Sequence, residues 1–295
     1  MSLTVTTSPS DTETKSSTAE RKPLPVIVLR PSRGWRAIDF RELWVFRDLL
    51  SSLAIRDVKL RYRQTALGAV WVVLQPLLAA GIFSFVFGTV AGLPTGGVPY
   101  VVFAYAGLLA WNLFNSIITK SSNSLVTHAS MVQKVFFPRM LLPISAVPGA
   151  LLDFFVALGM MAVLTVLNHT FSGWSILTLP VWVAIVVMLA TGIGLIASAL
   201  MVSYRDVGQI LPVGMQMLLY ISPIAYAVEA VPENIRPFFA LNPLVGVLEG
   251  FRWALVEGQP LNTGYAVYSA IASVVVFLLG GLTFRRMERK FADVV

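Results

Sequence analysis

Several residue types are scarce in this 295-residue chain: it has no cysteine, two histidines and only 13% charged residues. The absence of cysteine excludes a disulfide framework, a thiolate metal site and a cysteine nucleophile. His128 and His169 lie far apart and predict no metal cluster. Soluble domains are about a quarter charged, so this chain has too few charged residues to cover a soluble surface.

Other absences concern energy supply. No G-x-x-x-x-G-K-[S/T] motif and no Gly-Lys pair occurs, which excludes nucleotide binding by that loop. There are no paired acids in the apolar stretches and no inverted repeat with matching broken helices, which disfavours an ion-coupled transporter. Asp153 is the one acid within a predicted span. It has no expected Lys, Arg or His partner in the membrane, which favours a structural hydrogen-bonding role over a proton relay.

Apolar residues are abundant, at 56% of the chain with a mean hydropathy of +0.76. A bilayer core about 30 Å thick needs about 20 apolar helical residues. The predicted fold class is therefore an all-α integral membrane protein with six transmembrane helices in one permease domain, 31–295. The predicted spans are 67–90, 100–122, 140–167, 178–202, 209–228 and 265–284. Residues 1–30 are rich in Ser, Thr and Pro and predict a disordered tail with no cleavable signal peptide.

The 22 Lys and Arg residues predict the orientation. The 91–99 and 168–177 loops contain none, and 229–264 contains only Arg236 and Arg252. The others lie in the N-terminal region, the 120–139 and 203–208 loops and the C-terminal tail, which predicts cytoplasmic N- and C-termini. This distribution explains the positive net charge as a topology signal, with attraction to anionic lipid, rather than as nucleic-acid binding.

An amphipathic interface helix is predicted at 41–63. Leu43, Phe46, Leu50 and Leu53 share one face of a helical wheel, and Arg41, Asp48, Ser52, Arg56, Lys59 and Arg63 share the other. Trp35 and Trp44 suit headgroup depth. The alternative is a soluble surface helix, but its direct run into a span favours the membrane interface.

The external segment 229–264 contains a helix too short to span, 244–256, which begins after Asn242-Pro243. We expect short re-entrant gate helices here, with Asn242, Glu249, Arg252 and Trp253 as the gate residues. The alternative is an interfacial hairpin without a gating role, in which Glu249 and Arg252 merely make the helix soluble.

Six motifs occur in an order that resembles a known family, the membrane subunits of polysaccharide ABC exporters (type-2, Wzm-like permeases). The motifs are Arg56-Asp-Val-Lys-Leu-Arg-Tyr-Arg-Gln-Thr65 followed by Leu67-Gly68, Trp71 and Gln75-Pro76; Lys134-Val-Phe-Phe-Pro-Arg139; Tyr204-Arg-Asp-Val207; Ser222-Pro-Ile224; Asn242-Pro-Leu244; and Glu249-Gly-Phe-Arg252. The resemblance covers about residues 30–290.

The resemblance implies a non-catalytic half-transporter in the bacterial cytoplasmic membrane. It implies a homodimer with two copies of a separate ABC ATPase subunit, which binds MgATP, so that this chain itself holds no cofactor. The implied cargo is a polyprenyl-pyrophosphate-linked glycan of the galactan, O-antigen or teichoic-acid type, with galactan favoured by general likeness. The residues predicted to couple to the ATPase are Arg47, Asp48, His128, Gln133, Lys134, Arg139, Arg205 and Asp206. The alternative reading of the two loops among them is ordinary helix caps and positive-inside charges.

The basic cluster before the first span suits a lipid pyrophosphate, because Arg binds phosphate in bidentate geometry and Lys as a point charge. Aromatic rings suit the C–H faces of sugars, and amides suit their hydroxyls. The predicted pathway and headgroup residues are Arg56, Lys59, Arg61, Tyr62, Arg63, Trp71, Gln75 and Gln216. The alternative is that the cluster anchors the chain in anionic lipid and that Trp71 and Gln75 only pack.

Three other functions compete with glycan export. A drug or small-lipid ABC permease is the nearest alternative, and an ion-coupled secondary transporter would need essential membrane carboxylates. A scaffold without a pathway would tolerate changes at Gln75, Gln216 or the 244–256 helix.

Overall fold

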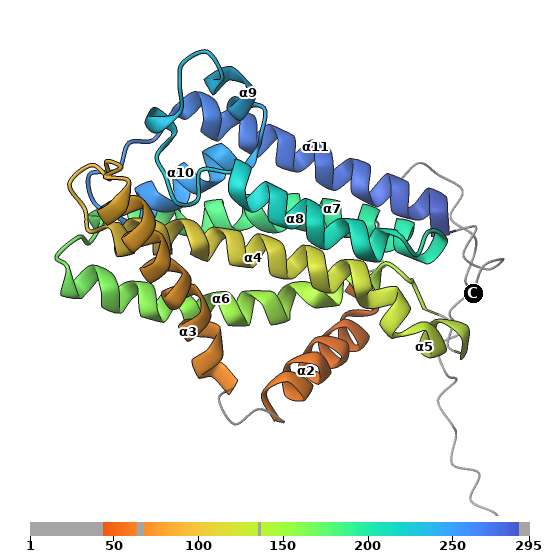
Figure 1. Ribbon diagram of the computed structural model, residues 1–295. Helices are drawn as coiled ribbons and strands as arrows, with labels where there is room; N and C mark the ends of the chain where they lie inside the picture. Colours follow the sequence, from red (N-terminus) through yellow and green to blue (C-terminus); the bar gives the residue numbers. More distant parts are fainter. Residues whose placement is uncertain (1–43, 64–67, 135–136, 289–295) are drawn as a thin grey trace, which may run out of the picture. The chain divides into compact units, whose positions relative to one another are not determined.

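The computed structural model describes residues 44–63, 68–134 and 137–288, with side chains apart from those of 60–63 and 68–69. All of these residues fall within the unit Trp35–Val295, and the predicted tail 1–30 lies outside them. Regular structure in the described ranges is helical (Figure 1), with one isolated β-bridge between Phe171 and Val256. The helices are α2 (Arg47–Arg63), α3 (Gly68–Phe83), the π-helix η1 (Ser84–Val90), α4 (Tyr100–Thr127), α5 (Ala129–Lys134), α6 (Leu141–Leu167), η2 (Gly173–Thr178), α7 (Leu179–Ser203), α8 (Val207–Ile221), η3 (Val228–Ala230), α9 (Arg236–Ala240), α10 (Leu244–Leu255) and α11 (Thr263–Glu288).

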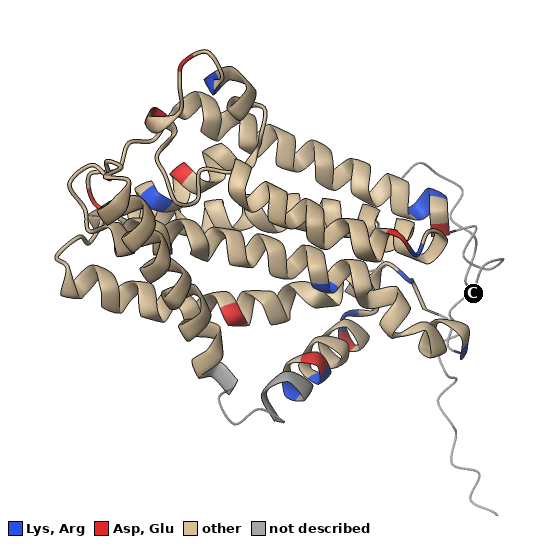
Figure 2. Cartoon of the chain, viewed as in Figure 1, with Lys and Arg blue, Asp and Glu red and all other residues tan. Residues whose placement is uncertain are grey.

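Five helical segments in the described ranges are long and apolar enough to cross a bilayer: Val70–Val90, Tyr100–Thr127, Leu141–Leu167, Gly173–Ser203 and Thr263–Glu288. They correspond to five of the predicted spans, and the all-α membrane fold class is confirmed. Figure 2 shows why these segments suit lipid: in the described ribbon, charged residues are sparse along the long helices and more frequent on α2 and near helix ends.

The predicted fifth span, 209–228, is not confirmed. Helix α8 has 15 residues and ends at Ile221, so it is about 22 Å long against a hydrocarbon core of about 30 Å. The cause is Ser222-Pro223: the residue before a proline is driven out of the helical region, and Ser222 is extended, with φ −77° and ψ 144°.

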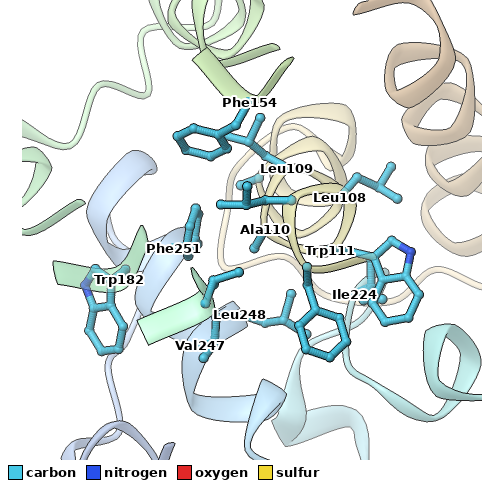
Figure 3. Packing of buried hydrophobic residues seen from close by; sticks show 14 of the residues in the cluster. Leu108, Leu109, Ala110, Trp111, Phe154, Trp182, Ile224, Val247, Leu248 and Phe251 are labelled. Atoms are coloured by element: carbon cyan, nitrogen blue, oxygen red, sulfur yellow. The ribbon is translucent and has the colours of Figure 1, made fainter. Parts of the chain in front are cut away.

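Helix α4 makes the central contacts of the fold, because α3, α6, α7, α8 and α10 all pack against it. In Figure 3, Leu248 and Phe251 of α10 lie near Leu109 of α4. The ring of Phe251 also meets Phe154 of α6 edge-on, with 6.0 Å between the ring centroids. The short helix α10 is thereby part of the hydrophobic core.

Helix α2 packs its apolar face on protein. Leu53 is buried, and Phe46 and Leu50 pack against a cluster that includes Leu141 and Phe284. The predicted apolar face is confirmed for these residues, whereas Arg41, Leu43 and Trp35 lie outside the described residues. On the other face, Asp48, Ser52, Arg56 and Lys59 are exposed.

Helices α7 and α11 approach closely because both carry glycine at the contact. A Cβ atom on Gly280 would lie 2.3 Å from the carbonyl oxygen of Gly192. The two backbones therefore meet with no space for a side chain, as small residues permit between membrane helices.

We predict that Gly280→Val disrupts the α7–α11 contact and removes most of the folded protein. Overpacking costs about 1–3 kcal/mol even where flexible side chains can yield, and here the obstacle is backbone. The yield of monodisperse protein in fluorescence-detected size-exclusion chromatography measures the effect. The control is Gly159→Val on α6, because a Cβ there meets no atom within 4 Å. Equal yields of the two variants would contradict the prediction.

Candidate functional site

A polar face runs along α4. Asn112, Asn115, Ser116, Thr119, Lys120 and Asn123 recur at the three- and four-residue spacing that places side chains on one side of a helix. The opposite side of α4 is buried and apolar, with Phe114, Ile117 and Ile118 among its residues.

The first cavity beside this face lies between α3, α4 and α6 and has a volume of about 270 Å³. Gln75 and Pro76 of α3 form one wall, and Asp153 of α6 lies in another. The ammonium of Lys120 donates a hydrogen bond to Oδ2 of Asp153 over 3.0 Å. The cavity therefore combines amides and hydroxyls with one compensated ion pair.

The expectation that Asp153 has no cationic partner in the membrane is wrong. The predicted second span, 100–122, and the predicted loop, 120–139, both include Lys120 and so place it at the edge of the membrane, but α4 continues to Thr127. The sequence offered a signal, since neither proline nor glycine occurs between Lys120 and Pro138 to stop the helix. Asp153 is 9% exposed, and the ion pair joins α4 to α6, which supports the structural role over the proton relay.

A second cavity, of about 300 Å³, lies on the other side of the polar face, against α7 and α8. Gln216 of α8 lines it together with Asn123 of α4, and Asn115 and Thr119 line both cavities. We call the two cavities and the polar face between them the α4 groove. Gln75, Asn112, Thr119, Asn123 and Gln216 are exposed in the single chain.

Of the predicted pathway residues, the structure places Gln75 and Gln216 in the α4 groove. Trp71 lies one turn before Gln75 on α3 and is 52% exposed, but it lines neither cavity. Arg56 lies on α2, where it hydrogen-bonds the Nε2 atom of His128 and lies 3.5 Å from Asp57. Lys59 is exposed on the same helix. The side chains of Arg61, Tyr62 and Arg63 lie outside the described residues.

The segment between α8 and α11 is held together around Arg252, which is 3% exposed. Its Nη2 donates to the carbonyls of Pro223 and Ile224, both at 2.6 Å, and its guanidinium lies over the ring of Phe103, 3.9 Å from the centroid. Within the described residues it forms no ion pair with Glu249. Both side chains are buried, so the pair does not serve to make the helix soluble, while a gating role of the segment stays a prediction.

The other predicted gate residues make contacts in the same segment. Asn242 begins α10: its Oδ1 accepts from the Leu244 N–H at 3.0 Å, and its Nδ2 donates to Ser222 Oγ at 2.9 Å. The carbonyl of Trp253 accepts from Ser172 Oγ at 2.8 Å. These bonds tie α10 to the end of α8 and to the 168–178 segment.

Burial raises the pKa of Glu249 to about 7. A hydrogen bond from the Asn262 backbone opposes the rise, the Glu229 carboxylate adds to it, and the Arg252 charge also opposes it. Glu249 is 9% exposed, and its Oε2 has no hydrogen-bond partner in the described part of the chain.

The predicted coupling residues lie at the start of α2, just after α4, on α5, just before α6 and between α7 and α8. Arg139 Nη1 donates to the carbonyl of Glu288 over 3.5 Å, which joins the start of α6 to the end of α11. Arg47 lies 3.8 Å from Asp48. Gln133, Lys134, Arg205 and Asp206 are exposed. An apolar cavity of about 160 Å³ lies beside Arg205, lined by Leu125, Val126, Ala129, Val132, Met201 and Val202.

We predict that Lys120→Met and Asp153→Leu each destabilise the protein by about 1–3 kcal/mol, less than for a fully buried pair, because the Lys120 side chain is 34% exposed. Each single variant leaves the remaining charge without its 3.0 Å partner. The double variant should recover part of the loss, since it leaves no uncompensated charge. Denaturation midpoints of the four proteins form a double-mutant cycle, and strictly additive losses would contradict the prediction.

A second prediction concerns pH. Because folding raises the pKa of Glu249 from 4.5 to about 7, its contribution to stability is full below pH 4.5 and is lost as the pH rises through about 7. We predict that Glu249→Gln stabilises the protein by about 1–2 kcal/mol at pH 8 and by less at pH 5. This is less than the free energy that corresponds to the whole pKa shift, because solvent in the cavity beside Glu249 screens its charge. Thermal denaturation at both pH values measures this. The exposed Glu233→Gln is the control, and an equal effect of Glu249→Gln at both pH values would count against it.

Comparison of the sequence with known proteins identifies its family. An O-antigen export system permease protein RfbA of Klebsiella pneumoniae is 29% identical, over 84% of this chain and 95% of its own length. The Myxococcus xanthus protein of the same name is 28% identical, over 86% of this chain and 97% of its own length. The polysialic acid transport protein KpsM of Escherichia coli is 24% identical, over 81% of this chain and 93% of its own length. The ABC-2 type transporter family matches residues 48–256, from the beginning of α2 to just beyond α10, and the chain belongs to this family.

Proposed function

We propose that this chain is the permease half of an ATP-driven exporter that moves a lipid-linked polysaccharide from the inner to the outer face of the cytoplasmic membrane. The observation that carries the proposal is the α4 groove. Its polar lining consists of amides, hydroxyls and one compensated ion pair, on helices that are otherwise apolar. Family membership and the export functions in the relatives' names support it.

The groove chemistry suits a glycan better than a drug. Amides and hydroxyls both donate and accept hydrogen bonds, so they can exchange partners with successive sugar hydroxyls while holding none tightly. A drug site is expected to be largely apolar with few polar groups. In the first cavity half of the lining residues are polar, among them Gln75, Asn112 and Asn115, and the second cavity adds Asn123 and Gln216 to a mainly apolar lining.

The exposure of the groove supports a homodimer. Polar side chains do not face lipid without a partner or water, yet Gln75, Asn112 and Gln216 are exposed in the single chain. In the proposal a second copy covers this face, and the glycan passes along the enclosed groove.

The charge distribution supports an orientation with both termini in the cytoplasm. Arg285 and Arg286 lie in the last turn of α11, and Arg205 follows α7, which in the proposal places these ends inside. The apolar cavity beside Arg205 and the exposed Gln133 and Lys134 then form the surface that docks one ATPase subunit, and the homodimer docks two. The α10 segment lies outside, as the gate.

The cargo in this proposal is a polyprenyl-pyrophosphate-linked glycan of the galactan, O-antigen or teichoic-acid type. Arg56 and Lys59 are the described members of the cluster proposed to meet the pyrophosphate, and Trp71 the described aromatic residue at the first turns of α3.

Depletion of this protein in its host tests the proposal. We expect one complete lipid-linked glycan to accumulate several-fold in lipid extracts analysed by mass spectrometry. The wild-type gene should reverse the accumulation, but a gene deleted for residues 244–256 should not.

A milder pair of variants separates transport from folding. Gln75→Leu with Gln216→Leu removes amides from the α4 groove and should leave the glycan accumulated, although the protein is made at normal levels. Phe155→Leu, at a position 60% exposed on α6, is the matched control and should restore export. An unchanged glycan pool after depletion would overturn the proposal in favour of a small-molecule exporter.

A further inference from the structure

A fourth cavity lies between η3, α9, α10 and the start of α11, away from the α4 groove. Its volume is about 270 Å³, well above the roughly 10–15 Å³ that one water requires. Its walls carry Glu229, Arg236, Glu249, Asn262 and Tyr265, with Val228, Pro260 and Leu261 as apolar lining. The proposed function uses this segment only as a gate and assigns the cavity no ligand.

Two of its polar side chains carry an atom without a partner. Oε2 of Glu249 and Nε of Arg236 are buried and make no hydrogen bond within the described residues. The Nη2 atom of Arg236 is used differently, since it donates to the carbonyls of Glu229 and Val231 at 3.3 and 3.0 Å. Buried polar atoms in folded proteins nearly always have partners, and these two have none among the described residues, so the walls of this cavity hold a buried acceptor and a buried donor whose hydrogen-bonding capacity is unused.

The composition of the walls limits the ligand class. Two carboxylates suit a cation, but the Arg236 guanidinium on the same cavity opposes one, and it would attract an anion that the two carboxylates repel. A neutral molecule rich in hydroxyls meets both demands, because each hydroxyl donates one hydrogen bond and accepts others. Tyr265 and the apolar residues supply a surface for the C–H face of a sugar ring.

We propose that this cavity binds one neutral sugar residue of the exported chain, as an exit site on the α10 segment. This inference rests on the proposed function and adds a ligand and its residues to it. Glu249 lies one turn before Arg252 on α10, and Arg252 is bonded to the carbonyls that follow α8. A sugar held by Glu249 is therefore attached to the helix that is fastened to the end of the pathway helix α8.

The pKa of Glu249, raised to about 7 by burial, fits this role. Near neutral pH the carboxyl is present in both forms, so it can accept a hydrogen bond from a sugar hydroxyl or donate one to it.

Saturation-transfer difference NMR on the purified full-length chain in lipid nanodiscs tests the site. The probes are the methyl glycosides of galactose, glucose and mannose, and N-acetylglucosamine, each at millimolar concentration. We expect saturation transfer to one of these sugars. The signal should fall at least fivefold in Glu249→Leu and persist in Glu249→Gln, which keeps an acceptor of the same shape.

The matched control is Glu233→Leu, which removes an exposed acid from the same segment but not from the cavity, and it should bind as the wild type does. Denaturation midpoints of all variants show whether each is folded. If Glu249→Leu is folded and keeps the full signal, or if no sugar binds the wild type, the exit site is wrong. Stabilisation by calcium chloride that is lost in Glu249→Leu, without sugar binding, would also overturn it in favour of a cation.

The outcome is separable from the proposed function. Glycan accumulation on depletion, together with absent sugar binding, removes the exit site and leaves the exporter. No accumulation on depletion removes the exporter, whatever the NMR result.

Discussion

The bonds from Arg252 to the carbonyls of Pro223 and Ile224 are the interaction on which the segment between α8 and α11 depends. A helix end leaves carbonyl groups without partners, and in a membrane water is not available to take them. At the end of α8 the Tyr226 hydroxyl donates to the carbonyls of Tyr220 and Ile221. The Arg252 guanidinium donates to those of Pro223 and Ile224 beyond the proline break, and it also stacks on Phe103 of α4. The approach requires glycine on α4, since a Cβ on Gly107 would lie 2.6 Å from the Ile224 oxygen. Helices α4 and α10 and the segment after α8 thus meet at one side chain.

The same break explains why α8 differs from the other apolar helices. Because α8 ends at Ile221, α10 can occupy the adjoining core position and pack against α4, α7 and α11. Two charged residues among the apolar helices have partners that offset the cost of burying them. Arg252 contacts two carbonyls and the Phe103 ring, and Lys120 pairs with Asp153. In both places the fold supplies the partner through a neighbouring helix, and the charge fastens the two helices together.

Hydropathy sufficed to predict five helices, because length and apolar content directly reflect the bilayer, but it placed the end of α4 at residue 122 although the helix continues to Thr127. The start of α10 followed from Asn242-Pro243, whose capping bond is local. Sequence reasoning failed where a contact joins distant residues. The partner of Asp153 is 33 residues away on another helix, and the partners of Arg252 lie nearly as far. No spacing rule reports such pairs. The placement of Gln75 and Gln216 on one groove likewise needs the packing of α3 and α8 on α4.

The electrostatics of the two polar regions suggest a division of labour in the proposed exporter. In the described part of the α4 groove the charges of Lys120 and Asp153 offset each other at 3.0 Å. The other polar groups of the groove are neutral amides and hydroxyls, so the electric field along it is small. Such a surface discriminates weakly between sugars, which suits passage of a long chain. The cavity at Glu249 instead holds acids, a guanidinium and buried atoms without partners. A site whose polar groups are left unpaired by the wrong ligand discriminates strongly, so in the proposed exporter the exit site on the α10 segment, rather than the groove, is the place for selectivity between sugars.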